Sequence, residues 1–221
     1  ALVGTMQTDA YTDPRLAAFF EPNSNGDYKG GVSGTNFSTT GSYKEAYWCR
    51  PVASYDMPVY LITLSEIEFY KAEYYARKGD AANAEAHYNA AIEESFATAG
   101  VDGAAKCISK FPYNNAKYAQ CIGIAKWVAL SGTNNFEAWC EARRLNYPEF
   151  ANDGADYYNV GNDKYAPENY VQGTLYTPIE YFGLLGANKL LERFPYANST
   201  STRNANCPDF KGYSEPIFWG K

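Results

Sequence analysis

Apolar residues recur at helical spacing on both sides of a single break between residues 57 and 100, and this is the clearest pattern in the chain. It predicts two antiparallel helices, Thr63 to Lys78 and Ala81 to Thr98, joined by a tight turn. Residues that can cap free backbone N–H groups stand where the helices start, and glycines that tolerate left-handed backbone stand where they end. These start and stop signals are Thr63, Gly79, Asp80 and Gly100.

Small and aromatic residues are spaced along this hairpin in a way that resembles a tetratricopeptide repeat. In such repeats small residues let two antiparallel helices approach closely, and an aromatic ring fills the space between them. The match is partial, because Glu68 and Lys71 stand where large apolar residues start the motif, and Phe96 stands where a proline closes it. A helical hairpin unrelated to such repeats is the alternative. The matching residues are Ala72, Tyr75, Gly79, Ala84, Tyr88 and Ala91.

Three further helices are predicted, at about 116 to 130, 135 to 146 and 178 to 193. Asn115 can cap the first of them, and Pro178 suits the first position of the last. The expected fold class is therefore all-α, a tetratricopeptide-like helical hairpin scaffold with long irregular loops.

Most of the chain outside these helices is predicted to be irregular. We expect one domain over residues 1–221, in which a loop-rich segment, 1–60, packs on a helical body, 61–193, followed by an irregular tail, 194–221. The tail ends on the apolar run Pro216 to Trp219, which is expected to dock back on the body because it is too apolar to be left in water.

Aromatic residues stand out in the loop-rich first segment, at Tyr28, Tyr43, Tyr47 and Trp48. Buried aromatic side chains commonly pin loops to a core. The other interpretation is a ligand platform, because a sugar can lay its apolar C–H face on a flat ring while polar neighbours bind its hydroxyls. Tyr43, Tyr47 and Trp48 are the candidate glycan-binding residues, with charged residues close by in the sequence.

The charge of the chain argues against nucleic-acid partners, since a formal net charge of −6 and a pI near 4.9 leave no basic face for phosphates. The sequence contains no run of about 18 apolar residues, so no membrane-spanning helix is predicted. The first residues do not have the basic-then-apolar pattern of a signal segment.

No residue pattern in the sequence predicts a metal site or a cofactor site, and we expect neither a metal nor a cofactor. The cysteines form no CxxC pair and do not group with His87, the single histidine, which is expected to be a packing or surface residue. Buried reduced thiols are the expected state of the cysteines in a chain of this size. The cysteines are Cys49, Cys107, Cys121, Cys140 and Cys207.

Two adjacent arginines, Arg143 and Arg144, invite a catalytic or anion-binding interpretation. Glu137 and Glu141 lie at helical spacing from them, so structural ion pairs are the favoured interpretation.

Several stretches in order along the chain resemble the C-terminal half of a SusD/RagB-family nutrient-binding outer-membrane lipoprotein. They include an early Asp-Pro-Arg-Leu, a Leu-Ile-Thr-Leu-Ser-Glu that leads into the first long helix, and a Glu-Ala-Arg-Arg that leads into Tyr-Pro. The matching stretches are Asp13 to Leu16, Leu61 to Glu66, Ala72-Glu73, Ile124 to Trp127, Glu141 to Arg144 with Tyr147-Pro148, Arg193 to Tyr196 and Phe218-Trp219.

This resemblance implies a non-catalytic protein that binds glycans, or in some members peptides, at the outer membrane, where a lipid anchor holds it. Its implied partner is a SusC-like TonB-dependent transporter, to which it delivers the ligand. Members of the family are about twice as long, so the chain looks like a fragment or an isolated domain. The ligand residues of the family lie in variable loops, and no such residue is carried over by motif.

Two other functions remain as alternatives. An intracellular tetratricopeptide-type interaction scaffold would explain the hairpin but not the loops, and a solenoid needs three or more stacked repeats. A glycoside hydrolase needs two carboxylates at a set separation, and no local arrangement selects such a pair. We therefore expect no enzymatic activity. A lipoprotein signal in the upstream coding sequence would separate the surface protein from the scaffold.

Overall fold

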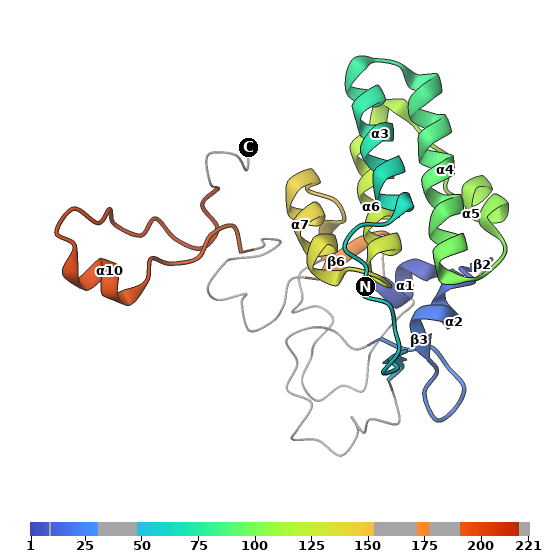
Figure 1. Cartoon of the computed structure of the whole chain (residues 1–221), viewed down its shortest axis with the longest axis horizontal. Coiled ribbons are helices and arrows are strands. Elements are labelled where there is room, and N and C mark those ends of the chain that lie inside the picture. Colours follow the sequence, from blue (N-terminus) through green and yellow to red (C-terminus); the bar gives the residue numbers. More distant parts are fainter. Residues whose placement is uncertain (9, 31–47, 153–171, 177–190, 217–221) are drawn as a thin grey trace.

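The computed structural model describes residues 1–8, 10–30, 48–152, 172–176 and 191–216 of the chain. Helices dominate these residues, and the strands are short (Figure 1). The helices are α1 (Leu2–Met6), α2 (Arg15–Phe19), α3 (Leu64–Lys78), α4 (Ala81–Ala99), α5 (Ala104–Lys110), the 3₁₀ helix η2 (Asn115–Lys117), α6 (Tyr118–Leu130), α7 (Asn135–Leu145) and α10 (Asn198–Arg203). The strands are β1 (Gln7–Thr8), β2 (Tyr11–Thr12), β3 (Phe20–Glu21), β4 (Arg50–Pro51), β5 (Glu149–Asn152) and β6 (Thr174–Tyr176).

Helices α3 and α4 form the predicted hairpin, and their ends follow the sequence signals. The Thr63 hydroxyl accepts a hydrogen bond from the backbone N–H of Glu66 at 3.2 Å, and Asp80 caps α4 by accepting one from Asn83 at 3.1 Å. Gly79 and Gly100 end the two helices with φ of 79° and 68°, values that glycine adopts without steric cost. The prediction of this hairpin is confirmed, with α4 one residue longer than expected.

The two helices of the hairpin pack closely because small residues line their shared face. Ala72, Ala84 and Ala91 are fully buried there. Phe69 and Tyr88 fill the space between the helices, with their ring centroids 6.2 Å apart in an edge-to-face arrangement. The small residues and Tyr88 therefore act as the tetratricopeptide-like pattern predicted. Tyr75 does not: it is half-buried and stacks on His87 at the surface, and Phe69 is the second ring of the core.

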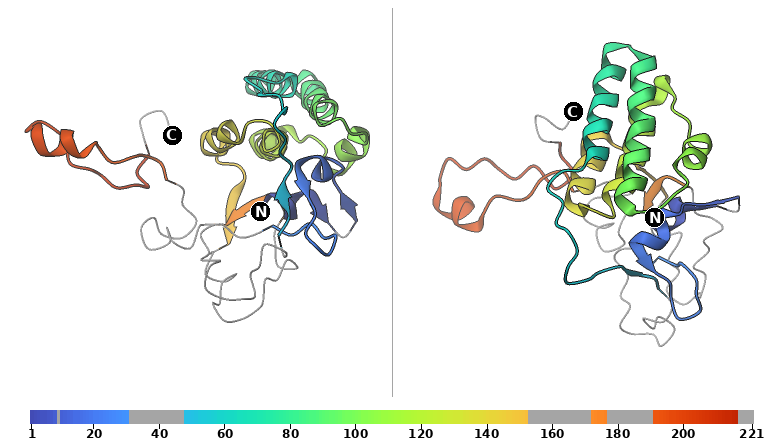
Figure 2. Two further views of the ribbon diagram at one scale, coloured as in Figure 1. Left: turned by 60° about the horizontal axis from the view of Figure 1, so that its bottom comes forward. Right: turned by 45° about the vertical axis from the view of Figure 1, so that its right-hand side comes forward.

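Helix α6 packs against α3, and α7 packs against α6, so these helices lie side by side when viewed nearly end-on (Figure 2, left). Both confirm sequence predictions. The start of α6 differs from the prediction. The short 3₁₀ helix η2 precedes α6, and Asn114 rather than Asn115 caps η2. Asn134 caps α7 by accepting a hydrogen bond from the backbone N–H of Glu137 at 3.2 Å.

The last predicted helix, 178 to 193, falls almost entirely outside the described residues. Its final three positions, 191–193, are described, and they are irregular rather than helical. The backbone N–H groups of Glu192 and Arg193 donate to the carbonyl of Tyr213, which joins the two sides of the tail around α10. Of the apolar run expected to dock on the body, only Pro216 is described, so that prediction stays open.

The described part of the first segment packs beneath the hairpin (Figure 1). Val3, Met6 and Leu16 form a second apolar cluster with Val128 of α6. Asp13 and Arg15 are buried as an ion pair, with Arg15 Nη2 at 2.6 Å from Asp13 Oδ2 and Nη1 donating to Ser95 of α4 at 2.8 Å. Each charge therefore has a hydrogen-bonded partner inside the fold.

Helix α5 was not predicted from the sequence. It has seven residues and no side-chain cap, and Gly103 precedes it with φ of 113°. All five cysteines are free thiols; Cys107 in α5 is buried, as expected, and the other four are half-buried.

Candidate functional site

The predicted platform aromatics fall at the edge of the described chain. Tyr43 and Tyr47 lie outside the described residues. Trp48 is half-buried, and the backbone N–H of Cys49 beside it donates to the carbonyl of Lys29 at 2.8 Å, which anchors this end of the loop. Tyr28 packs against the second apolar cluster and so acts as a structural aromatic. The role of Trp48 in ligand binding stays a prediction.

A shallow groove of about 550 Å³ lies on the outer side of α3, next to α4. Such a volume lies within the range of about 300–1,000 Å³ that is usual for small-molecule sites. Its lining residues are mostly aromatic and come mostly from one side of α3. They are Ile67, Tyr70, Lys71, Tyr74 and Tyr75 of α3, and His87 of α4.

Three rings of this groove contact one another in sequence. Tyr74 meets Tyr75 edge-to-face, with centroids 5.3 Å apart, and Tyr75 lies parallel to the His87 imidazole at 5.2 Å. The Tyr74 side chain is 57% exposed. An aromatic surface in the groove is therefore open to solvent, while the rings behind it are held by stacking.

Charged groups flank the rings. His87 Nδ1 lies 2.6 Å from Glu68 Oε2, and the Lys71 ammonium donates to Glu68 Oε1 at 2.6 Å. Hydrogen bonding from Lys71 lowers the pKa of Glu68, so this carboxylate stays ionised at neutral pH. The expectation that His87 is a packing or surface residue agrees with its position on the rim of the groove.

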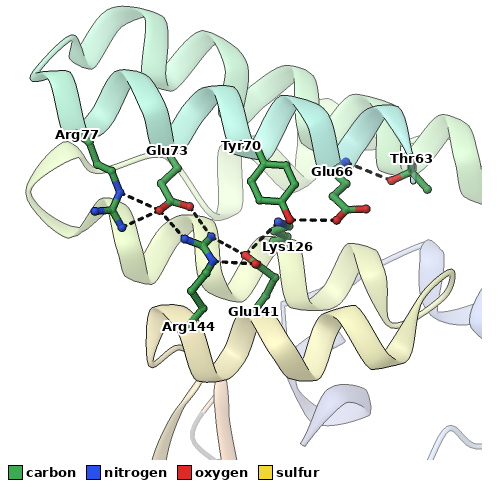
Figure 3. A network of polar contacts seen from close by, with 8 residues as sticks. All are labelled: Thr63, Glu66, Tyr70, Glu73, Arg77, Lys126, Glu141 and Arg144. Carbon is green, nitrogen blue, oxygen red and sulfur yellow. Dashed lines mark hydrogen bonds and ion pairs between the residues drawn. The ribbon is translucent and has the colours of Figure 1, made fainter. Parts of the chain in front are cut away.

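A network of charged residues lies between α3, α6 and α7 (Figure 3). The Arg144 guanidinium donates to both carboxylate oxygens of Glu73 at 2.8 and 2.6 Å, and to both of Glu141 at 2.8 and 2.7 Å. Arg77 adds a second partner for Glu73 at 2.8 Å. Two bidentate pairs on one guanidinium thus tie α3 to α7.

Lys126 of α6 completes this network. It is 1% exposed, and its Nζ lies 3.0 Å from Glu141 Oε2 and 3.4 Å from the centroid of the Tyr70 ring. The Tyr70 hydroxyl donates to Glu66 at 3.3 Å. Tyr70 therefore connects the buried charges with the surface groove, and its ring position depends on Lys126.

Two opposing effects set the pKa values of the charged groups in this network: burial disfavours the charged form, and ion pairs favour it. Burial raises the pKa of Glu73 and of Glu141, but the hydrogen bonds from Arg144 outweigh it and hold both values below the ordinary one. Burial lowers the pKa of Lys126 and raises that of Glu66. The carboxylates beside Arg144 are thus fixed in the ionised state as structural partners.

The sequence predicted that Arg143 and Arg144 form ion pairs with Glu137 and Glu141, and the structure agrees with this in part. Arg144 pairs with Glu141 as expected, and with Glu73, which sequence spacing could not identify. Arg143 pairs with neither Glu137 nor Glu141; instead it stacks on Trp139, with its guanidinium carbon 4.6 Å from the ring centroid, and donates to the Glu192 carbonyl at 2.6 Å. Arg143 also forms an ion pair with Glu192, with Nη2 3.5 Å from Oε2, and so holds the chain just before the tail against α7.

Among the residues that the structure describes, no three His, Cys, Asp or Glu side chains gather closely enough to hold a metal ion. Within the same ranges, none of the helices has both the length and the apolar character needed to cross a bilayer.

Fold and groove together define an all-α, tetratricopeptide-like scaffold with an aromatic surface. Residues 2–171 match the SusD-like family, which is described as starch-binding and associating with the outer membrane. The chain therefore belongs to this family, as the sequence resemblance implied. No curated protein sequence gives a significant match.

Solved structures of SusD homologues share the fold. One from Bacteroides thetaiotaomicron superposes with a TM-score of 0.65 at 19% identity, over 94% of this chain and 49% of that chain. One from Parabacteroides distasonis gives a TM-score of 0.62 at 26% identity, over 95% and 44% of the two chains. One from Bacteroides uniformis gives 0.60 at 19% identity, over 95% and 47%. The chain thus spans about half the length of the structures it matches.

Proposed function

We propose that this protein binds glycans at the surface of the outer membrane and delivers them to a TonB-dependent transporter. The observation that carries the proposal is the match of residues 2–171 to a family described as starch-binding. Exposed aromatic rings on a rigid helical scaffold support it, because such rings can stack on the apolar faces of sugars.

We also propose that the protein has no enzymatic activity. Of the buried carboxylates in the described residues, Asp13, Glu73 and Glu141 are engaged by arginine or lysine side chains, and Glu66 accepts a hydrogen bond from the Tyr70 hydroxyl at 3.3 Å. Glycoside hydrolysis needs one carboxyl group held protonated and a second one free to act on the sugar. Groups locked in ion pairs do not suit those roles.

The test is direct binding of purified protein to four neutral oligosaccharides, maltoheptaose, cellohexaose, xylohexaose and mannohexaose, by isothermal titration calorimetry. Maltoheptaose is the first choice because of the family description. We expect saturable binding of at least one of them, without release of new reducing ends. Failure of all four to bind, or steady hydrolysis of a bound one, would contradict the proposal.

Trp48, together with Tyr43 and Tyr47, remains the predicted contact in the loop. Replacing Trp48 by Ala removes a stacking face and should weaken binding by about 2- to 10-fold, in line with about 0.5–1.5 kcal/mol for one aromatic contact. Trp48→Phe keeps a flat ring and serves as the matched control. Unchanged affinity in the alanine variant, or a marked loss of melting temperature, would instead indicate that Trp48 packs inward.

A further inference from the structure

A cavity of about 210 Å³ lies inside the fold, between the N-terminal segment and helices α4, α5 and α6. Much of its wall is deeply buried and apolar: Met6, Ile92 and Val128 are each at most 4% exposed. Native interiors contain few voids larger than a water molecule, because an unfilled void lowers stability. A cavity of this size therefore needs an explanation other than ordinary packing.

Most polar groups at the wall of the cavity already have partners. Asp13 and Arg15 form a buried ion pair, so their charges balance each other. Burial raises the pKa of the Cys107 thiol, which is therefore neutral at pH 7. The Tyr88 hydroxyl donates to the Phe111 carbonyl at 2.9 Å. The wall thus offers neither an unbalanced charge nor a row of free hydrogen-bonding groups.

The end of α5 and the first turn of α6 form the outer part of the lining. Pro112 is its exposed residue, and Phe111, Gln120 and Cys121 are half-buried, so the cavity reaches the surface here. The side-chain amide of Gln120 has no hydrogen-bond partner among the residues that the structure describes. It is a polar group open to a ligand at the mouth of an otherwise apolar cavity.

The size and chemistry of the cavity select the class of ligand. An apolar cavity of about 150 Å³ takes up benzene, so this one has room for a single substituted ring. A sugar carries a hydroxyl on nearly every carbon and would leave most of them unpaired here. A charged molecule would lose its hydration and find the charges of the wall already paired with each other.

We propose that this cavity binds a small uncharged ring compound, with the apolar ring against Met6, Ile92 and Val128 and one polar group on the Gln120 amide. A mainly apolar pocket with a few polar groups that orient the ligand is the usual form of a small-molecule site. The site differs from a glycan site in place and in ligand class, and it does not rest on the proposed function.

Three ligands of similar shape test the ligand class by isothermal titration calorimetry at pH 7: toluene, 4-methylphenol and 4-methylbenzoate. We expect 4-methylphenol to bind about 2- to 10-fold more tightly than toluene, because it adds one hydrogen bond. The charged 4-methylbenzoate should not bind. Gln120→Met keeps the length of the side chain but removes the amide, so this variant should bind the two neutral ligands equally well. Binding of 4-methylbenzoate more tightly than toluene, or an unchanged preference for 4-methylphenol in Gln120→Met, would overturn the proposal.

Filling the cavity should remove the site. Ala125→Leu enlarges a side chain of the lining and should weaken binding of both neutral ligands at least about tenfold. Cys121→Leu fills the cavity from one turn earlier in α6, and it replaces the first variant if that one shows no cooperative melting transition. Ala86→Leu makes the same change at an exposed alanine of α4 outside the lining and should bind like the wild type.

The same titrations on the complete protein that contains this chain are the control for burial by further residues, since the chain spans about half the length of the solved structures it matches. We expect the complete protein to bind toluene and 4-methylphenol as well. The proposal is overturned if the wild-type chain binds neither ligand, if folded Ala125→Leu or Cys121→Leu binds both as tightly as the wild type, or if the complete protein binds neither.

Discussion

Arg144 of α7 joins its own helix to α3 through two buried carboxylates. Its side chain is 40% exposed, yet it donates to Glu73 and Glu141, whose side chains are 8% and 4% exposed. Because two nearly buried carboxylates face each other across this guanidinium, removing it would leave like charges close together in a poorly solvated place.

Replacing Arg144 by Met should lower the free energy of unfolding by about 2–4 kcal/mol, somewhat below the usual cost of breaking a buried pair because part of the guanidinium is solvated. Urea unfolding at pH 7 measures this. Arg77→Met is the control: Arg77 also binds Glu73 but is more exposed, so the loss should be below about 1 kcal/mol.

The effect of Arg144 should also depend on pH. Glu73 and Glu141 have lowered pKa values in the folded state, so their ion pairs stabilise the protein above the ordinary pKa of 4.5. That stabilisation is lost as the pH falls through the lower folded values. The difference in stability between wild type and Arg144→Met should therefore shrink in acid, and a difference that stayed constant down to pH 3 would argue against this account.

At the scale of the helix, capping residues in the sequence predicted the helix ends that depend on interactions within one turn. Thr63, Asp80 and the glycines after α3 and α4 fixed the hairpin because caps act within one turn. Helix α5 was missed because it has no side-chain cap to mark its start. Gly103 precedes it with φ of 113°, which a residue with a side chain rarely adopts, and a Cβ there would also lie 3.2 Å from Pro14 Cγ.

The groove could be predicted only in part. Tyr70 and Tyr74 share a face by helical period alone, which the sequence shows. The stacking of His87 on Tyr75 depends on the register between α3 and α4, and the bond from Arg144 to Glu73 joins residues 71 positions apart. Neither relation leaves a periodic trace in the sequence, so single-sequence reasoning could not predict the groove. The candidate site that it did predict, at Tyr43, Tyr47 and Trp48, stays a prediction.

Gly123 offers a test of helix packing. A Cβ at this position in α6 would lie 2.7 Å from the Cβ of Tyr147 and 3.3 Å from its carbonyl oxygen. Alanine favours helix by about 1 kcal/mol over glycine, but the backbone after α7 would have to move, so Gly123→Ala should destabilise the protein by about 1–2 kcal/mol on balance. Thermal unfolding checks this; a raised melting temperature would mean that helix propensity dominates.

At the scale of the molecule, the described residues form a helical body from which less regular segments extend (Figure 1). The N-terminal segment lies beneath the hairpin and the part with α10 extends away from it (Figure 1). Since the chain spans about half the length of the solved structures it matches, docking to a transporter is a property to be tested on the complete protein that contains this chain.

Such a test is co-purification from outer membranes. A tagged complete protein, extracted in mild detergent, should bring down a TonB-dependent transporter in near-stoichiometric amount. Recovery of the tagged protein without any transporter would count against the partnership.

The bond between Glu73 and Arg144 also bears on how the chain is made. At about 5–20 residues per second, a ribosome needs about 4–14 s to add the 71 residues that separate the two, whereas helices and local turns form within microseconds. The hairpin can therefore be complete while Glu73 still has no guanidinium. A nascent chain that ends before Arg144 should contain a formed but weakened hairpin, and α7 should dock on it only after Arg144 has been added.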